Sequence, residues 1–295
     1  MAGRIGVDLG GTNVRVALVN DQGTVLASHS EKTEAEKGPD YIIAKIINMI
    51  DRYKKKEPIR GIGIGAPGPL NAKKGLILNP PNLPGWDHIP LVQKLEKHFQ
   101  TSVVLDNDAN VAALAEAKVG SGQGYESVFY LTVSTGIGGG FVINDRIYSG
   151  AHGYAAEIGN MIIDPSGYKH ANMNQGSWES LASGTAIARQ ALKEFGHTGG
   201  TKEVFTLAQE GHESAVKIVH QTVDYLAMGI ANIAHTIDPD VFVLGGGVMN
   251  SKTLILEPLK QKVKEYVYPE LAESIHIVHA SLEDQAGVVG AALLI

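Results

Sequence analysis

The fold of this chain is decided by residues 5–12, which read IGVDLGGT. Apolar residues predict a strand over residues 4–9, the glycine pair predicts a turn, and residues 14–19 predict a second strand. Residues 20–23 (NDQG) then turn the chain into a third predicted strand over residues 24–29. A glycine turn at a strand end can bind an anion, because no Cβ blocks the approach to its backbone N–H groups.

The same pattern returns near the middle of the chain. Residues 128–133 (VFYLTV) predict a strand, residues 134–140 (STGIGGG) a glycine turn and residues 141–143 a second strand. The dipeptide Asn-Asp follows, as it does at residues 20–21. The echo favours two lobes that share one ancestral unit, with two unrelated glycine-turn hairpins as the alternative.

Strand and helix signals alternate along the chain, which is typical of an α/β architecture. Isoleucines at 42, 43, 46, 47 and 50 predict the buried face of a helix over residues 41–53. A short strand around residues 62–64 ends at the Ala-Pro-Gly-Pro sequence of residues 66–69. The remaining predicted elements are strands at 103–105 and 241–244 and helices at 109–119, 180–194, 214–236 and from 285 onward.

Composition excludes several classes of protein. The 295 residues are 44% hydrophobic, and 25 Lys and Arg against 31 Asp and Glu give a net charge of −6, so no summed positive field exists to hold nucleic acid or an anionic membrane. The longest apolar run, residues 286–295, is shorter than the roughly 20 residues that a membrane-spanning helix needs. No signal peptide pattern opens the chain, and we expect a cytoplasmic protein. The absence of cysteine excludes disulfides and thiolate metal sites.

Three glycine runs each follow an apolar strand, at residues 10–12 (GGT), 136–140 and 245–247 (GGG). Two of them carry a threonine whose hydroxyl can donate to a phosphate oxygen, and together they favour a nucleotide site over purely structural turns. No Gly-Lys pair exists, which excludes a Walker A loop. Residues 63–68 (GIGAPG) match the dinucleotide fingerprint, but Pro67 and Pro69 oppose the helix that the fingerprint requires.

Four motifs in a fixed order carry a resemblance to a known family: residues 8–12 (DLGGT), 106–110 (DNDAN), 135–140 (TGIGGG) and 245–247 (GGG). Spread over nearly the whole chain, they resemble the ROK family of sugar kinases, repressors and open reading frames. The resemblance implies an α/β fold of the actin-like ATPase (ribonuclease H-like) type, with two lobes, a central cleft for ATP, and a homodimer. We expect a small lobe of residues 1–118 plus 283–295 and a larger lobe of residues 119–282.

The resemblance also assigns the nucleotide-binding residues. It implies that Gly10, Gly11 and Thr12 face the transferred phosphate and that Thr135 and Gly136 hold the other phosphates. The residues that border the adenosine would be Gly245, Gly246 and Gly247. Asp8 would orient magnesium through water, a role compatible with that of a strand-end carboxylate capping the turn.

A kinase that phosphorylates a hydroxyl needs an acceptor for the hydroxyl proton. Residues 106–108 (DND) lie where a predicted strand meets a predicted helix, so either Asp could simply be the helix N-cap. The resemblance instead implies that Asp108 is the catalytic base and that Asn107 binds sugar hydroxyls, and Asp106 is interpreted as structural. A carboxylate at a helix N-terminus stays ionised, as a base must.

Further sugar contacts are implied at Gly65, Asn82, Glu157, Asn160 and Glu179. Carboxylates suit sugar sites because each can accept hydrogen bonds from two vicinal hydroxyls. The alternative for Glu179 is a surface position on a helix.

The family's zinc site is expected to be missing. ROK members usually place one His and three Cys around a tetrahedral zinc ion. Asn160 stands at the His position here, and His170, Asn172 and Ser177 stand at the Cys positions. We therefore expect no zinc, and we expect residues 165–178 to be held by packing and hydrogen bonds.

The resulting hypothesis is a kinase that uses ATP and Mg²⁺ to phosphorylate the 6-hydroxyl of a hexose, with glucose as the first choice. The loop of residues 82–86 (NLPGW), which is similar to that of glucose-specific members, carries this choice. N-acetylmannosamine kinase and β-glucoside kinase are the close alternatives. A sugar-responsive repressor would need a DNA-binding domain before residue 4, and a non-catalytic sugar sensor would be expected to lack Asp108.

Overall fold

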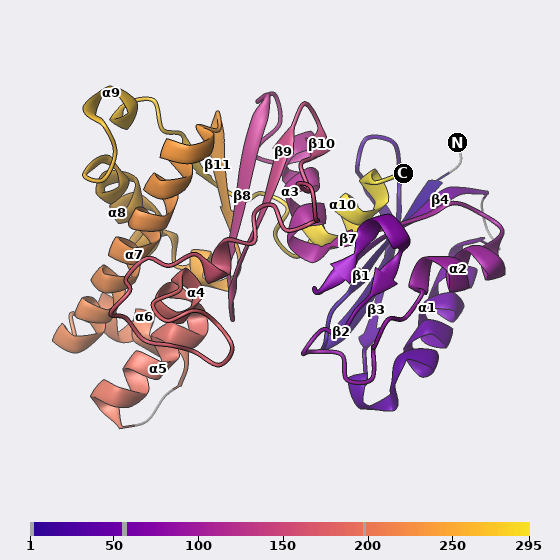
Figure 1. Cartoon of the computed structure of the whole chain (residues 1–295), viewed down its shortest axis with the longest axis horizontal. Helices are drawn as coiled ribbons and strands as arrows, with labels where there is room; N and C mark the ends of the chain where they lie inside the picture. Colours follow the sequence, from indigo (N-terminus) through magenta and orange to yellow (C-terminus); the bar gives the residue numbers. More distant parts are fainter. Residues whose placement is uncertain (1–2, 55–57, 197–198) are drawn as a thin grey trace. The chain divides into compact units, whose positions relative to one another are not determined.

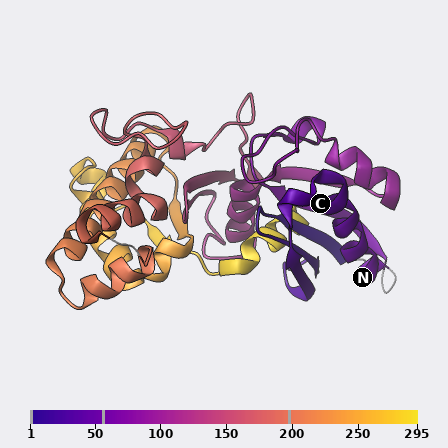
Figure 2. The same cartoon turned by 90° about the horizontal axis from the view of Figure 1, so that it is seen from below.

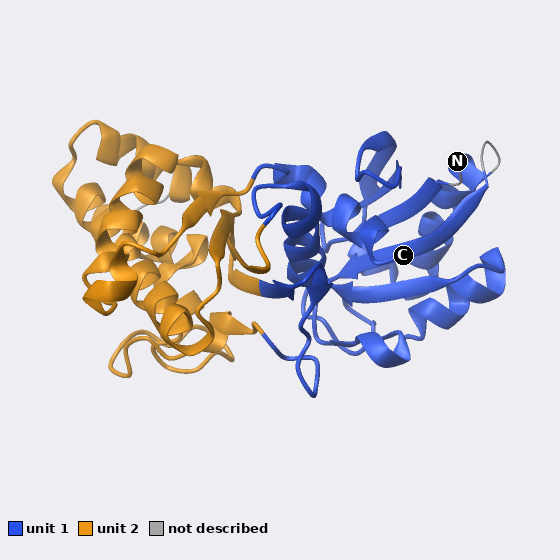
Figure 3. Cartoon of the chain, turned by 90° about the horizontal axis from the view of Figure 1, so that it is seen from above, with its two compact units in different colours: residues 1–124, 140–155, 281–295 blue, residues 125–139, 156–280 orange. Residues whose placement is uncertain are grey.

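The structure is a computed structural model of the chain, and it describes residues 3–54, 58–196 and 199–295. The chain forms two compact units (Figure 3). Unit 1 comprises residues 1–124, 140–155 and 281–295, and unit 2 comprises residues 125–139 and 156–280. The predicted lobes differ from these units chiefly at residues 140–155, which group with unit 1.

Unit 1 contains a five-stranded sheet in the order β3-β2-β1-β4-β7. Its strands are β1 (Gly3–Leu9), β2 (Asn13–Val19), β3 (Val25–Lys32), β4 (Ile59–Ala66) and β7 (Val103–Asn107). The first three strands form an antiparallel meander, and β1, β4 and β7 run parallel. Asp8 pairs with Gly65, which pairs with Asp106, so the carboxyl ends of the three parallel strands meet at one edge of the sheet.

Helices cover both faces of this sheet. On one face, α1 (Pro39–Lys54) and α2 (Leu91–Phe99) close a core with Ile42, Ile46 and Ile50, the predicted buried isoleucine face. On the other face, α10 (Ala286–Leu293) packs against β1, β4 and α3 (Asp108–Val119), as Figures 1 and 2 show. The last helix thus returns to the amino-terminal sheet, as the resemblance implied.

Glycines in the sheet let α10 come close. A Cβ at Gly6 would lie 1.9 Å from the carbonyl oxygen of Val288, and a Cβ at Gly63 would lie 1.7 Å from that of Ala291. Gly63, the first glycine of the fingerprint-like sequence, therefore serves helix-on-sheet packing. The chain beyond it continues as strand β4 to Ala66 and opens no helix.

The central sheet of the second half has the order β10-β9-β8-β11-β12. Its strands are β8 (Ser127–Val133), β9 (Ile137–Ile143), β10 (Arg146–Ile147), β11 (Val241–Gly245) and β12 (Ile277–His279). The predicted glycine turn over residues 134–140 is wrong in its second half, because β9 already begins at Ile137. Gly139 lies within this strand, where a Cβ would be 2.9 Å from Ile158 Cδ1, so close packing explains the glycine.

With the observed strand boundaries, the two glycine-turn hairpins are more similar than the sequence predicts. Strands β1, β2, β8 and β9 each contain 7 residues. Only residues 10–12 separate the first pair, and only residues 134–136 separate the second pair. The two hairpins therefore correspond position by position, which favours the shared ancestral unit over unrelated hairpins.

The helices of unit 2 are α4 (Trp178–Ala182), α5 (Gly184–Phe195), α6 (Thr201–Gln209), α7 (Glu213–Ile237), α8 (Lys252–Lys264) and α9 (Pro269–Ala272). The single helix predicted over residues 180–194 is wrong, because Ser183 ends α4 and begins α5. Its hydroxyl accepts a hydrogen bond from the backbone N–H of Ala186 at 3.1 Å, the usual N-cap contact. Among the described residues, no helix is long and apolar enough to cross a membrane.

Candidate functional site

The carboxyl edge of the unit 1 sheet gathers several of the predicted site residues. Asp8 lies there, next to the end of β1. Its carboxyl group is so close to α10 that a Cβ at Gly287 would be 2.8 Å from Asp8 Cγ. Burial raises the pKa of Asp8, and the charge of Arg15 opposes this only in part. A carboxylate desolvated in this way gains most from a nearby cation, which fits the magnesium role expected for Asp8.

The turn of residues 10–12 follows Asp8 directly. Gly10 N donates to Asn13 O at 3.0 Å, and both Gly10 and Thr12 have carbonyl groups that accept hydrogen bonds from Thr33. Gly11 lies against the loop that carries Asn82, because a Cβ at residue 11 would be 2.8 Å from Asn82 O. Within unit 1, the structure thus brings the predicted phosphate turn and a predicted sugar residue into contact.

The loop that presents Asn82 is anchored by two apolar side chains. Leu83 and Trp86 are fully buried, whereas Asn82 is exposed. Backbone hydrogen bonds from Leu83 N to Pro80 O and from Trp86 N to Leu83 O keep the loop tight. The short strands β5 (Leu70–Asn71) and β6 (Leu76–Ile77) precede it and pair with each other.

The Asp-Asn-Asp sequence ends β7 and begins α3. Asn107, and neither Asp, is the N-cap, because its side-chain oxygen accepts from Ala109 N at 2.9 Å. Asp108 is the first residue of the helix, is exposed, and accepts from Ala109 N at 2.8 Å. Its carboxylate therefore lies at the positive end of the α3 dipole, where a charged base is stabilised.

Asp106 has a different environment. Its side chain accepts hydrogen bonds from Asn110 Nδ2 at 2.8 Å and from Asn107 N at 2.7 Å. Burial still raises the pKa of Asp106 despite these two bonds. The neighbouring Gly65 is buried as well, and a Cβ there would be 2.6 Å from Val111 Cγ2, so only its backbone is available to a ligand.

The corresponding turn of unit 2, residues 134–136, is held by the start of α5. Gly184 N donates to Ser134 O at 2.7 Å, while Thr185 donates to Thr135 O from both its backbone N–H and its hydroxyl. Thr135 itself is exposed. Next to the turn, Glu179 Oε2 accepts from Ile137 N at 2.9 Å, and a Cβ at Gly136 would lie 2.4 Å from the same oxygen. Glu179 is therefore half-buried and tied to the turn, so the surface alternative for it is wrong.

Unit 2 contains three of the residues predicted to contact the sugar: Glu157, Asn160 and Glu179. Glu157 comes just before the short helix η3 (Ile158–Asn160), and desolvation of its carboxyl group together with the charge of Glu179 raises its pKa. Asn160 is exposed, and its side-chain oxygen accepts from Asn174 N at 2.6 Å. Hydroxyls of a sugar can donate hydrogen bonds to both carboxyl groups, which would offset the repulsion between them.

The last predicted run, Gly245 to Gly247, ends β11. Gly246 has φ +91°, and a Cβ there would lie 2.4 Å from Val133 O, so only glycine fits. Gly247 is exposed and has no atom within 4 Å of a Cβ position, which leaves its backbone open to a flat ligand such as a nucleobase.

Comparison with known proteins identifies the family. The model of the ROK family matches residues 4–295. The chain belongs to the ROK family. A glucokinase of Thermotoga maritima is 33% identical over 305 aligned positions, which cover 99% of this chain and 96% of that protein.

Two solved ROK structures are similar over the whole chain. The ROK hexokinase from Thermus thermophilus is 36% identical with a TM-score of 0.91, covering 99% of this chain and 97% of that one. A ROK family glucokinase from Streptomyces griseus in complex with glucose and AMPPNP is 31% identical with a TM-score of 0.82, covering 99% of both chains. This ROK chain therefore has the two-lobed actin-like ATPase fold that its motifs implied.

Three of the four positions of the usual ROK zinc ligands form hydrogen bonds here. Ser177 is buried, with its hydroxyl 2.6 Å from that of Ser180. His170 donates its backbone N–H to the Ser180 hydroxyl at 3.2 Å. Asn160 bonds Asn174, while Asn172 is exposed. Within the described ranges, no three His, Cys, Asp or Glu side chains come together as a metal site.

A cation–aromatic contact also holds this ROK loop. The guanidinium of Arg189 lies 3.8 Å from the centre of the Tyr168 ring and donates to Ser180 O at 2.8 Å. Sequence reasoning missed this pair and the threonines that contact the two turns, Thr33 and Thr185. Their partners lie far along the chain, and no local motif marks such contacts.

Proposed function

We propose that this chain is an ATP-dependent glucose kinase that transfers the terminal phosphate of ATP to the 6-hydroxyl of the sugar. The full-length likeness to glucokinases supports the activity. The observation that carries the proposal is the exposed Asp108 carboxylate at the N-terminus of α3, beside Asn107 and at the same sheet edge as Asp8 and Gly65.

In the proposed reaction, Asp108 accepts the proton of the 6-hydroxyl as the hydroxyl oxygen attacks the terminal phosphorus. The bond from that phosphorus to the bridging oxygen breaks, and ADP leaves. Asn107 and Asn82 would orient the sugar, since both are amides at the same end of the sheet. The backbone N–H groups of Gly10 to Thr12 would bind the transferred phosphoryl group, in keeping with the contact between Gly11 and Asn82.

The group that fits the acidic end of β1 is Mg²⁺. Asp8 would hold it through water, and the raised pKa of this buried carboxyl supports a cation partner. A bound magnesium ion would neutralise the charge of the ATP phosphates.

We assign the unit 2 residues to complementary roles. Thr135 and Gly136 would bind the remaining phosphates, and Gly245 to Gly247 would border the adenosine. Glu157, Asn160 and Glu179 would accept and donate hydrogen bonds to the sugar hydroxyls. The amide oxygen of Asn160 accepts from Asn174 N, so its amide nitrogen would be the group that donates to a sugar hydroxyl.

Asn160 also supports an alternative substrate. An amide in place of the family's imidazole changes the groups near C1 and C2 of the sugar, which favours either an N-acetylated hexose or a β-glucoside as the second candidate. We rank glucose first because Asn82 lies in the glucose-type loop.

The test is a coupled assay of ADP release over a panel that contains glucose, mannose, N-acetylmannosamine and cellobiose. We expect the highest kcat/KM with glucose, because polar groups that a bound analogue covers and leaves unpaired discriminate strongly against that analogue. A higher kcat/KM for N-acetylmannosamine or cellobiose contradicts the glucose assignment and leaves the kinase assignment intact. We also propose that the protein acts in the cytoplasm, where ATP is supplied. We propose that it forms a homodimer, and light scattering after gel filtration tests this.

A further inference from the structure

We propose that each phosphate turn is positioned from behind by a threonine hydroxyl, Thr33 for residues 10–12 and Thr185 for residues 134–136. The proposal rests on the proposed assignment of these turns to the phosphates of ATP. Neither threonine touches the nucleotide in this scheme, so both are positioning residues.

Thr33 is fully buried just beyond the end of β3. Its backbone N–H donates to Thr12 O at 2.9 Å, which continues the β2–β3 ladder by one step. Its hydroxyl donates to Gly10 O at 2.6 Å, a contact that strand pairing does not require. One residue thus holds the carbonyl groups at both ends of the turn.

Holding a carbonyl fixes the direction of the next N–H group. In a trans peptide the C=O of one residue and the N–H of the following residue point in opposite directions. The bond to Gly10 O therefore directs the N–H of Gly11 away from Thr33, toward the open side of the turn where Thr12 is exposed. Such fixed donors stabilise developing charge without reorganisation during the reaction.

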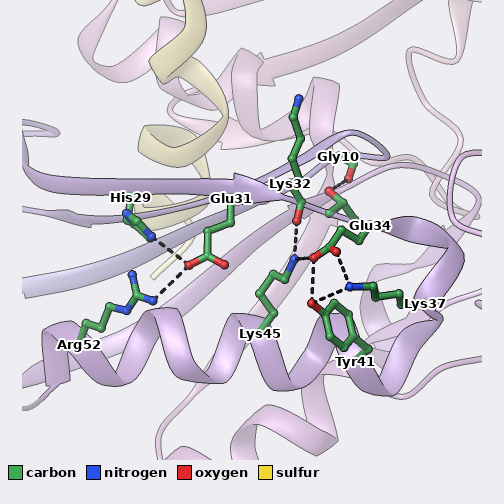
Figure 4. Close-up of polar contacts among 10 residues, drawn as sticks. Gly10, His29, Glu31, Lys32, Glu34, Lys37, Tyr41, Lys45 and Arg52 are labelled. Carbon is green, nitrogen blue, oxygen red and sulfur yellow. Dashed lines mark hydrogen bonds and ion pairs between the residues drawn. The ribbon is translucent and has the colours of Figure 1, made fainter.

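The segment that carries Thr33 is itself fixed by α1. Lys45 donates to Lys32 O at 2.5 Å and to Glu34 Oε2 at 2.6 Å, and Tyr41 OH donates to the same carboxylate at 2.8 Å (Figure 4). Lys37 also pairs with Glu34, and these partners lower the pKa of Glu34 to about 2. Glu34 has φ +55°, a conformation that a glutamate rarely adopts without such support. The backbone on both sides of Thr33 is therefore held in place.

Unit 2 contains a similar contact from a threonine hydroxyl to a turn carbonyl, but the threonine lies on a helix. Thr185, in the first turn of α5, donates to Thr135 O from its hydroxyl at 2.8 Å and from its backbone N–H at 3.2 Å. By the same peptide geometry this contact directs the N–H of Gly136. The hydroxyl of Thr33 holds the first carbonyl of its turn, whereas that of Thr185 holds the second carbonyl of its turn. One threonine follows a strand, and the other lies in the first turn of a helix. Because unrelated elements make similar contacts, we infer that the function of each turn requires a fixed backbone.

The test compares Thr33→Val, Thr33→Ser and Thr185→Val with wild type. Valine keeps the volume of threonine and removes the hydroxyl, while serine keeps the hydroxyl. We expect both valine variants to raise the KM for MgATP and to lower kcat, giving a fall in kcat/KM of about tenfold each, because the carbonyl loses the hydroxyl that fixes the direction of the next N–H group. The Kd for glucose, measured by calorimetry without nucleotide, should change less than about twofold, and Thr33→Ser should restore most of the MgATP parameters.

Thr222→Val is the matched control. Thr222 is also fully buried and donates to a backbone carbonyl, Ile218 O, at 2.9 Å, but inside helix α7. We expect it to lose stability without a change in the KM for MgATP. If Thr33→Val does not fold, Thr185→Val at its less buried position gives the same readout.

Thr12→Val tests the assignment of the turn to phosphate separately from the positioning role of Thr33 and Thr185, because Thr12 belongs to the turn itself and is exposed. If Thr12→Val weakens MgATP and the positioning variants behave like Thr222→Val, the threonine proposal is overturned. Failure of Thr33→Ser to restore activity overturns it as well. If Thr12→Val also leaves MgATP unaffected, the assignment of the turn to phosphate fails first, and the threonine proposal with it.

Discussion

Two aspartates that are separated by one residue have different surroundings. Asp106 is largely buried and accepts two hydrogen bonds, whereas Asp108 is exposed at the start of α3. A proton acceptor for a substrate must be reachable and charged, and Asp108 meets both conditions. The chemical difference therefore comes from position relative to the helix end.

The first prediction concerns Asp108→Asn. The substitution keeps the shape and removes the proton acceptor, so turnover should fall by at least about 10²-fold while glucose binding is largely kept. Steady-state kinetics and calorimetry measure the two quantities. Near-normal turnover would return Asp108 to a purely structural role at the helix end.

A second prediction concerns the pH dependence of stability at Asp106. Because its pKa is raised in the folded state, folding favours the protonated form. The stability contributed by this group is present below its ordinary pKa of 3.8 and is lost as the pH rises through the higher folded value. Asp106→Asn removes this titration, so its free energy of unfolding relative to wild type should increase as the pH rises above the ordinary pKa of 3.8.

Urea unfolding at several pH values measures this difference, and a difference that stays flat with pH contradicts the account. Catalysis should be much less affected than in Asp108→Asn, because Asp106 contacts only Asn107 and Asn110 in the described hydrogen bonds.

At the level of elements, the close approach of α10 to the unit 1 sheet depends on single glycines. Gly63→Ala would put a Cβ 1.7 Å from Ala291 O, which is backbone and cannot move aside, so α10 must shift. We expect a loss of at least about 1–3 kcal/mol in the free energy of unfolding. Denaturant titration measures it.

Gly61→Ala is the matched control on the same strand. A Cβ there would meet Ile295 Cγ2 at 2.7 Å, the flexible end of a side chain at the carboxyl terminus. We expect a clearly smaller loss for Gly61→Ala, and equal losses for the two variants would contradict the packing argument.

The segment of residues 165–178, which ends at the first residue of α4, is where this chain departs from the usual ROK pattern. Its contacts include Asn160 with Asn174, Ser177 with Ser180, and Arg189 with Tyr168. The fourth prediction is that purified protein carries no stoichiometric zinc and that dialysis against a chelator leaves its melting temperature unchanged in the absence of magnesium. One equivalent of zinc that survives dialysis, or a large drop in melting temperature on chelation, contradicts it.

At the scale of the whole molecule, Glu116 secures chain segments next to the boundaries between the units. Its fully buried carboxylate on α3 accepts from Ser121 N at 2.9 Å, Ser281 N at 3.2 Å and Leu282 N at 2.8 Å. The first segment of unit 1 ends at residue 124 and its last segment begins at residue 281, so one side chain ties both segments to α3.

The fifth prediction is that Glu116→Ala lowers the free energy of unfolding by about 3 kcal/mol or more, because three backbone N–H groups lose a fully buried carboxylate acceptor at once. Glu116→Gln, which keeps one acceptor oxygen, should lose less. A thermal or urea unfolding series measures the order, and equal stability of wild type and Glu116→Ala contradicts it.

The sequence by itself determined what depends on local pattern. Periodic apolar residues predicted β1, β2, β3, β4, β7, β8 and β11 and helices α1, α3, α7 and α10 to within a few residues, but they did not predict α2, α6, α8, α9 or β12. Glycine turns marked the ends of β1, β8 and β11. The order of the motifs predicted the ROK family and its fold, which the whole-chain matches confirmed. The assignment of individual site residues stays a prediction.

Only the tertiary structure decided the contacts between distant segments. No local rule indicates that β9 begins at Ile137 or that Glu179 accepts a hydrogen bond from the N–H of Ile137, 42 positions away. Thr33 and Thr185 meet their turns 23 and 50 positions away. The physical reason is that patterns of hydrophobicity and turn residues act over a few positions, whereas a buried polar group takes whichever partner the packed fold brings within hydrogen-bond distance.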